Sequence, residues 1–124
     1  MMTDRSLSRH ERLRTLGAIR RLFTEGETGF VFPFRYVWYA EADTEPSVEV
    51  LFSPPKKFHK RANKRNLVRR RTKEAYRLQK QVLTLHVGER NVDLALIYSS
   101  AEVLSSKRIE HAVRRILETI ASRL

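Results

Sequence analysis

The strongest constraint on how this chain can fold is a basic segment at its centre, residues 56–80. The segment holds 12 of the 25 Lys and Arg residues, but Glu74 is its one acid among the 14 Asp and Glu residues. The rest of the chain balances 13 bases against 13 acids, so the whole formal net charge of +11 lies in this segment. Like charges at this density repel one another and destabilise a compact state. The segment is therefore expected on the surface, where it can face a polyanionic partner.

The size and composition of the chain favour one soluble domain. A length of 124 residues suffices for a modest hydrophobic core. The absence of cysteine excludes disulfides and cysteine-based zinc sites. The first 17 residues contain no uninterrupted apolar run, so neither a secretory signal nor a membrane span is expected there. We predict a single cytoplasmic domain, residues 1–124, with no membrane partner.

The basic segment itself predicts a long helix. Residues 61–83 contain no Gly or Pro, and apolar residues recur at a seven-residue interval. The apolar arc consists of Val68, Ala75 and Val82, flanked by Leu67 and Leu78. The opposite arc consists of Arg65, Asn66, Arg69, Arg70, Lys73, Arg77 and Lys80. Lys64 and Arg71 lie nearer the apolar arc, where their stems are expected to pack while the charges reach solvent.

The remaining residues predict two helices and three strands. Ser8 to Glu11 read as a capping box for a first helix that ends near Gly26. Residues 30–40 and 47–53 are rich in aromatic and β-branched residues, which predicts two antiparallel strands joined by an acidic turn. Residues 91–99 predict a central strand, and Ser105 is a candidate cap for a terminal helix. The apolar face of that helix consists of Ile109, Ala112, Val113, Ile116, Leu117, Ile120 and Leu124. The resulting order is α-β-β-α-β-α.

No constellation of catalytic or metal-binding residues is found in the sequence. There is no glycine-rich phosphate loop. The four histidines lack the spacing of metal ligands, so surface or capping roles are expected for His10, His59, His86 and His111. The acids between Glu41 and Glu49 fit a solvated turn. We predict no catalytic residue and no metal ligand in this chain.

Residues 56–77 resemble the signature of the bacterial ribonuclease P protein family. That signature is a lysine pair, a short basic loop, an Arg-Asn-Arg motif followed by an aliphatic residue and two bases, and a Glu-Ala-aromatic ending. The matching residues are Lys56, Lys57, Arg65, Asn66, Val68, Arg69, Arg70, Glu74, Ala75 and Tyr76. Three positions depart from the pattern. Leu67 replaces the third motif residue, His59-Lys60-Arg61 stands where a glycine-containing loop is usual, and Ile19 stands where Phe is frequent.

The resemblance implies a fold and an activity. The fold would be a small two-layer α+β sandwich, in which the basic helix joins two parallel strands with a left-handed crossover, against the usual right-handed rule. The protein would bind the catalytic RNA of ribonuclease P and the 5′ leader of precursor tRNA. Mg²⁺ held mainly by the RNA would serve the cleavage, with no ion on the protein alone and no protein partner.

The resemblance also assigns two sets of binding residues. The catalytic RNA would contact Lys56, Lys57, Lys60, Arg61, Lys64, Arg65, Asn66, Arg69, Arg70, Lys73 and Arg77. The leader would enter a cleft between the first helix and the sheet, lined by Phe23, Phe34, Tyr36 and Trp38. Ordinary core packing explains these aromatic residues nearly as well.

Two other functions would use the same features. A ribosomal or other structural RNA-binding protein could carry an identical basic helix without any role in cleavage. A self-sufficient nuclease would instead need carboxylates or histidines of its own at a reaction centre.

Overall fold

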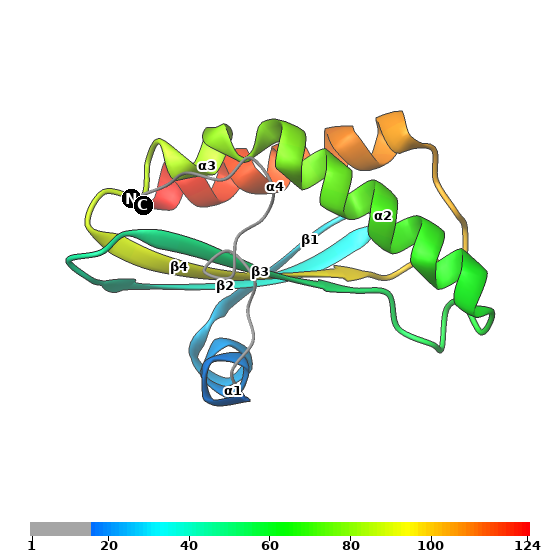
Figure 1. Ribbon diagram of the computed structural model, residues 1–124, viewed down its shortest axis with the longest axis horizontal. Coiled ribbons are helices and arrows are strands. Elements are labelled where there is room, and N and C mark those ends of the chain that lie inside the picture. Colours follow the sequence, from blue (N-terminus) through cyan, green and yellow to red (C-terminus); the bar gives the residue numbers. More distant parts are fainter. Residues whose placement is uncertain (1–15) are drawn as a thin grey trace.

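The computed structural model describes residues 16–124, in which helices lie on both faces of a four-stranded sheet (Figure 1). The elements are α1 (Leu16–Glu25), β1 (Glu27–Val31), β2 (Phe34–Ala42), β3 (Ser47–Ser53), α2 (Ala62–Gln79), α3 (Gln81–Thr84), β4 (Arg90–Tyr98) and α4 (Ser106–Arg123). Helix α1 lies on one face of the sheet, and α2, α3 and α4 lie on the other (Figure 1). The capping box predicted at Ser8 lies outside the described residues. The predicted α+β sandwich is confirmed.

The sheet contains one strand more than the sequence predicted. Strand β1 pairs antiparallel with β2, and the turn between them falls at Phe32 and Pro33, inside the single strand predicted for residues 30–40. The pairing places Gly29 beneath the ring of Tyr36, where any side chain would collide with that ring. The glycine that weakens the strand pattern in the sequence is therefore the residue that allows the hairpin to close.

The strand order also differs from the prediction. Strands β2 and β3 run in opposite directions, as expected, but they do not pair with each other. The order is β1-β2-β4-β3, with β4 antiparallel to β2 and parallel to β3. Strand β4 takes the central place because it is the most apolar strand, with Val92 to Leu96 buried on both of its faces. The parallel pair joined by the basic helix is confirmed, and the handedness of that crossover stays a prediction.

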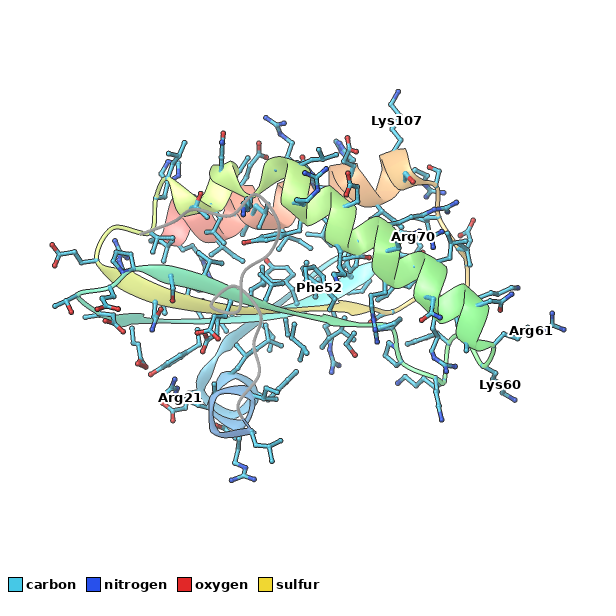
Figure 2. All side chains as sticks on the ribbon, viewed as in Figure 1. Arg21, Phe52, Lys60, Arg61, Arg70 and Lys107 are labelled. Atoms are coloured by element: carbon cyan, nitrogen blue, oxygen red, sulfur yellow. The ribbon has the colours of Figure 1, made fainter. Side chains whose placement is uncertain are left out.

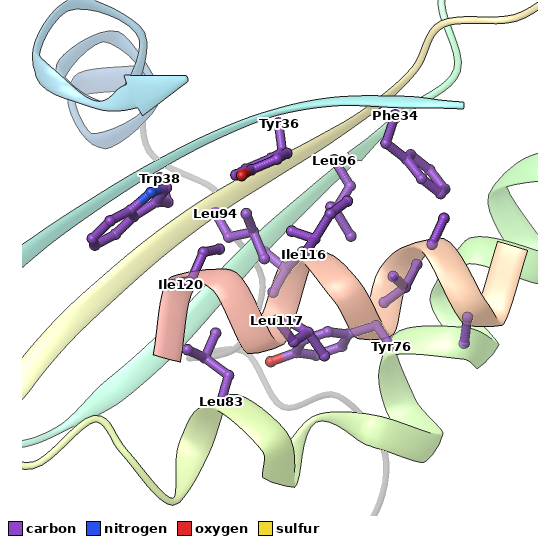
Figure 3. Close-up of a cluster of buried hydrophobic side chains, with 14 of the residues drawn as sticks. Phe34, Tyr36, Trp38, Tyr76, Leu83, Leu94, Leu96, Ile116, Leu117 and Ile120 are labelled. Atoms are coloured by element: carbon purple, nitrogen blue, oxygen red, sulfur yellow. The ribbon is translucent and has the colours of Figure 1, made fainter. Parts of the chain in front are cut away.

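The main core lies between the sheet and the helices α2, α3 and α4 (Figure 3). Leu94 and Leu96 of β4 point toward Ile116 of α4, and Leu117 lies on the other side of α4, beside Tyr76 of α2 (Figure 3). Six of the seven apolar residues predicted for the terminal helix are buried, and Leu124 is partly buried. The predicted cap is also present, since the Ser105 hydroxyl accepts a hydrogen bond from the Arg108 amide at 3.3 Å.

The buried face of α2 is rotated slightly from its predicted position. It consists of Val68, Thr72, Ala75 and Tyr76. Because Tyr76 occupies the sheet side of this stripe, Leu78 is turned outward and is 57% exposed, so its assignment to the apolar arc was wrong. No helix among residues 16–124 is long and apolar enough to cross a membrane.

Candidate nucleic-acid interface

The outer face of α2 and the loop before it form a cationic surface. Nine of the eleven residues predicted to contact RNA are exposed, and Arg65 and Lys73 are half-buried. In Figure 2, Lys60 and Arg61 project from the beginning of α2, and Arg70 lies midway along the helix. The opposite side of the helix is buried against the rest of the protein. The cationic face therefore has no second role in the core and is available to a polyanion.

Arg65 holds the basic loop in place. Its Nη1 donates hydrogen bonds to the carbonyl oxygens of His59, at 2.9 Å, and Lys60, at 2.8 Å. Hydrogen bonds from a charged donor are among the stronger ones in proteins. Arg65 therefore positions Lys60 and Arg61 beside the first turn of α2, in addition to any contact of its own with RNA.

The loop is anchored from the other side by His59. This side chain is 4% exposed, so the prediction of a surface or capping role was wrong. Its Nε2 lies 3.0 Å from the Ala101 carbonyl oxygen, and its ring centre lies 5.7 Å from that of Tyr98. The imidazole fills the space under the loop, at the position where the family pattern has a glycine-containing turn.

The two predictions about bases beside the apolar arc have different outcomes. Arg71 is half-buried, and its Nη1 donates to the Leu104 carbonyl oxygen at 2.6 Å, which confirms that its stem packs. Lys64 is exposed instead. Near the end of the helix, Arg77 binds the Glu74 carboxylate through two hydrogen bonds, which lower the pKa of Glu74. Much of the charge of Arg77 is therefore already compensated.

Helix α1 is fixed to the second face of the sheet. Leu22 is buried against Val37 and Ala95. Arg21 lies 5.4 Å from the centre of the Tyr39 ring, and its guanidinium is 4.0 Å from the Asp93 carboxylate. Asp93 is 6% exposed, and this burial raises its pKa, although Arg21 acts in the opposite direction.

The aromatic residues predicted for a leader cleft separate into two groups. Phe34, Tyr36 and Trp38 are 0%, 7% and 6% exposed and point into the main core (Figure 3). Their assignment to an open cleft was wrong, because a ring that is buried against α4 offers no face to a base. The alternative explanation, core packing, accounts for all three. Phe23 on α1 is 45% exposed, so its assignment to the leader cleft stays a prediction.

The structure adds two residues that the sequence analysis missed. Phe30 is 58% exposed and pairs across the hairpin with the exposed Arg35. Paired residues point to the same side of a sheet, and Arg35 alternates with Phe34 and Tyr36, so Phe30 and Arg35 lie on the α1 side. The sequence signal was the alternation itself, which left open which of its two faces is the core.

These features define a class: small basic α+β domains with a cationic helix on one side and exposed aromatic rings on the other. The family model described as Ribonuclease P matches residues 7–121. The chain therefore belongs to the ribonuclease P protein family.

Curated relatives agree with this assignment over nearly the whole chain. The ribonuclease P protein component of Porphyromonas gingivalis is 35% identical over 118 residues, which cover 93% of this chain and 86% of that protein. The corresponding protein of Chlorobaculum tepidum is 33% identical over 132 residues, covering 94% and 84% of the two chains.

Solved structures share the fold. The RNase P protein from Thermotoga maritima superposes with a TM-score of 0.70 at 19% identity, over 88% of this chain and 96% of that one. A Staphylococcus aureus RNase P protein gives a TM-score of 0.62 at 16% identity, over 89% and 94%. At these identities, the two structures support the fold alone.

Proposed function

We propose that the chain is the protein subunit of ribonuclease P, a single RNA-binding domain that assists removal of the 5′ leader from precursor tRNA. The observation that carries this proposal is the exposed cationic face of α2 in a member of this family. In the holoenzyme, an endonuclease and hydrolase, the protein would bind two RNAs through two different surfaces.

The cationic face of α2 binds the catalytic RNA subunit. Arg69 and Arg70 are exposed there, and neither has a carboxylate partner among the described residues. Each such base that neutralises a phosphate releases a condensed counterion, so binding is strong at low salt and weakens steeply as salt rises. Asn66 lies on the same face and adds a neutral hydrogen-bonding group.

The α1 side of the sheet binds the 5′ leader. The half-exposed rings of Phe23 and Phe30 provide stacking surfaces for unpaired bases, and Arg35 provides a charge for a phosphate. Stacking on aromatic rings tolerates any sequence, as a subunit that serves many different leaders requires.

Hydrolysis belongs to the RNA and to Mg²⁺ that the RNA holds. The protein contributes positive charge, which lowers phosphate repulsion where substrate and catalytic RNA meet and so lowers the Mg²⁺ concentration needed for activity. The whole complex acts in the cytoplasm.

Reconstitution tests this function. The purified protein is added to the catalytic RNA and a precursor tRNA at low Mg²⁺, and cleavage at the mature 5′ end is measured against RNA alone. We expect faster cleavage and tighter substrate binding. A structural RNA-binding protein would change neither, and a self-sufficient nuclease would still cut after the catalytic RNA is digested away.

A further inference from the structure

A pocket on the far side of the β1–β2 hairpin has no place in the function proposed above. Its volume is about 420 Å³, and it lies where the hairpin turn meets the first half of α4. The turn contributes Phe32, and α4 contributes Lys107, Arg108, His111 and Arg115. Figure 2 shows Lys107 projecting from the beginning of α4, on the same side of the sheet as α2.

The charged residues that line this pocket are all basic. Among residues 16–124, no Asp or Glu lines it, and no carboxylate forms an ion pair with Lys107, Arg108 or Arg115. Elsewhere on the same helix, Arg114 pairs with Glu118 and Arg123 pairs with Glu27. The unpaired bases of α4 are therefore concentrated at this pocket, as is expected of a site for an anion.

A second pocket of the protein has the opposite character. It has a volume of about 650 Å³ and is lined by acids from several elements. These acids are Glu25, Glu27, Glu41 and Glu89, set against Arg90 and Arg123. A surplus of bases is thus not a general property of the concave surfaces of this chain.

An exposed ring completes the cationic pocket. Phe32 is 48% exposed, and it lines the pocket together with Lys107, Arg108 and Arg115. A cationic pocket that presents an aromatic face is the combination that binds a phosphate together with an unpaired base. The volume lies in the range of small-ligand sites, and a concave pocket of this size does not fit the broad, shallow minor groove of an RNA duplex.

We propose that this pocket is a second site for single-stranded RNA, which binds one unpaired nucleotide of the leader upstream of those on the α1 side. The base stacks on Phe32, and the phosphate lies against Arg108 and Arg115. The hairpin connects the two sites, because Phe30 points to the α1 side and Phe32 lies in the turn that follows. β1 is an edge strand, so a leader can pass from one side to the other around the turn. This inference rests on the proposed binding of the leader to the α1 side.

The test measures the affinity of the assembled holoenzyme for precursor tRNA whose leader is lengthened one nucleotide at a time. With the unchanged protein we expect affinity to rise in two stages. Arg108→Ala with Arg115→Ala, and separately Phe32→Ala, should remove about tenfold of affinity from the second stage and leave the first intact. Arg114→Ala, on the same helix but paired with Glu118, is the matched control and should keep both stages.

Three results would overturn the proposal in distinguishable ways. An unchanged second stage in the pocket variants would show that the leader does not reach the pocket. If the pocket variants instead bind the free catalytic RNA more weakly, the pocket is a site for that RNA and not for the leader. If the unchanged holoenzyme shows no dependence on the leader at all, the proposed leader site on the α1 side fails as well.

Discussion

The two faces of the sheet carry similar side chains but have different structures. On the α4 side, the rings of Phe34, Tyr36 and Trp38 are buried in a closed core. On the α1 side, Phe30 and Phe23 keep about half of their surface in solvent. Aromatic content alone therefore does not separate a core from a binding surface. The faces differ in the helices that cover them, since α2, α3 and α4 lie on one face and, within residues 16–124, α1 lies on the other.

The geometry of the helices explains the difference. Helix α4 has 18 residues and is about 27 Å long, which nearly matches the roughly 30 Å of the nine-residue strand β2. The described part of α1 has 10 residues, or about 15 Å, and covers about half of such a strand. Within residues 16–124, Phe23 and Phe30 on this side stay about half exposed.

The largest effect is expected for a change on the closed face. Phe34→Ala removes a fully buried ring that packs edge-to-face on Tyr98, with ring centres 5.4 Å apart. We expect the free energy of unfolding to fall by about 3–5 kcal/mol, measured by urea denaturation. A loss below about 1 kcal/mol would show that this face is not the main core.

A change on the α1 side should affect RNA binding more than the free energy of unfolding. Phe30→Ala is expected to alter the free energy of unfolding by less than about 1 kcal/mol. It should nevertheless weaken holoenzyme binding to leader-bearing precursor by about 1–3 kcal/mol, because a stacking surface is lost. Leu78→Ala is the matched control, since Leu78 has almost the same exposure, 57% against 58%, but lies on α2. Equal losses in the two variants would remove the distinction between the faces.

The cationic face of α2 should respond mainly in its salt dependence. Replacing both Arg69 and Arg70 with Ala should weaken binding to the catalytic RNA and reduce the log-log slope of affinity against salt by about one to two. The control replaces Arg114 and Arg123, two exposed arginines already paired with glutamates. If the control flattens the slope equally, RNA binding is not specific to α2.

The smallest effect concerns the contact that fixes α1. Burial raises the pKa of Asp93, so its ionised form is less stable in the folded protein than in the unfolded chain. The contribution of Asp93 to stability is therefore fully present below the ordinary carboxyl pKa of 3.8 and is lost as pH rises through the raised pKa. Arg21 limits the loss, and Glu41 adds to it. Urea denaturation is measured from below pH 3.8 upward through the raised pKa of Asp93. As pH rises, the Asp93→Asn variant should become more stable relative to the unchanged protein. A constant difference would contradict this assignment.

The local patterns were predictable from the sequence. The spacing of Ile109, Val113, Ile116 and Ile120 identified both α4 and its buried face, because a helix places residues three and four apart on one side. The charge pattern identified α2 and its outward face for the same reason. Within the binding set, the exposure of Arg69 and Arg70 followed from their place on the arc opposite Val68, Ala75 and Val82.

Features set by contacts between distant residues were not predictable. The central place of β4 was predicted from its apolar run, and the sheet confirms it. Its insertion between β2 and β3 was not predicted, because the acidic turn between those two strands favoured their direct pairing. The core side of β2 depends on which helices cover each face, so Phe34 was assigned to a cleft and Phe30 was overlooked. His59 is buried because residues 42 positions later in the chain fold over it.

Cross-linking from each side of the sheet tests the separation of the two surfaces most directly. A photoreactive phenylalanine analogue is placed at Phe30, and separately at Arg70, and each holoenzyme is irradiated with bound precursor tRNA. We expect position 30 to cross-link to the 5′ leader and position 70 to the catalytic RNA. Cross-links from position 30 to the catalytic RNA alone, or from position 70 to the leader, would contradict it.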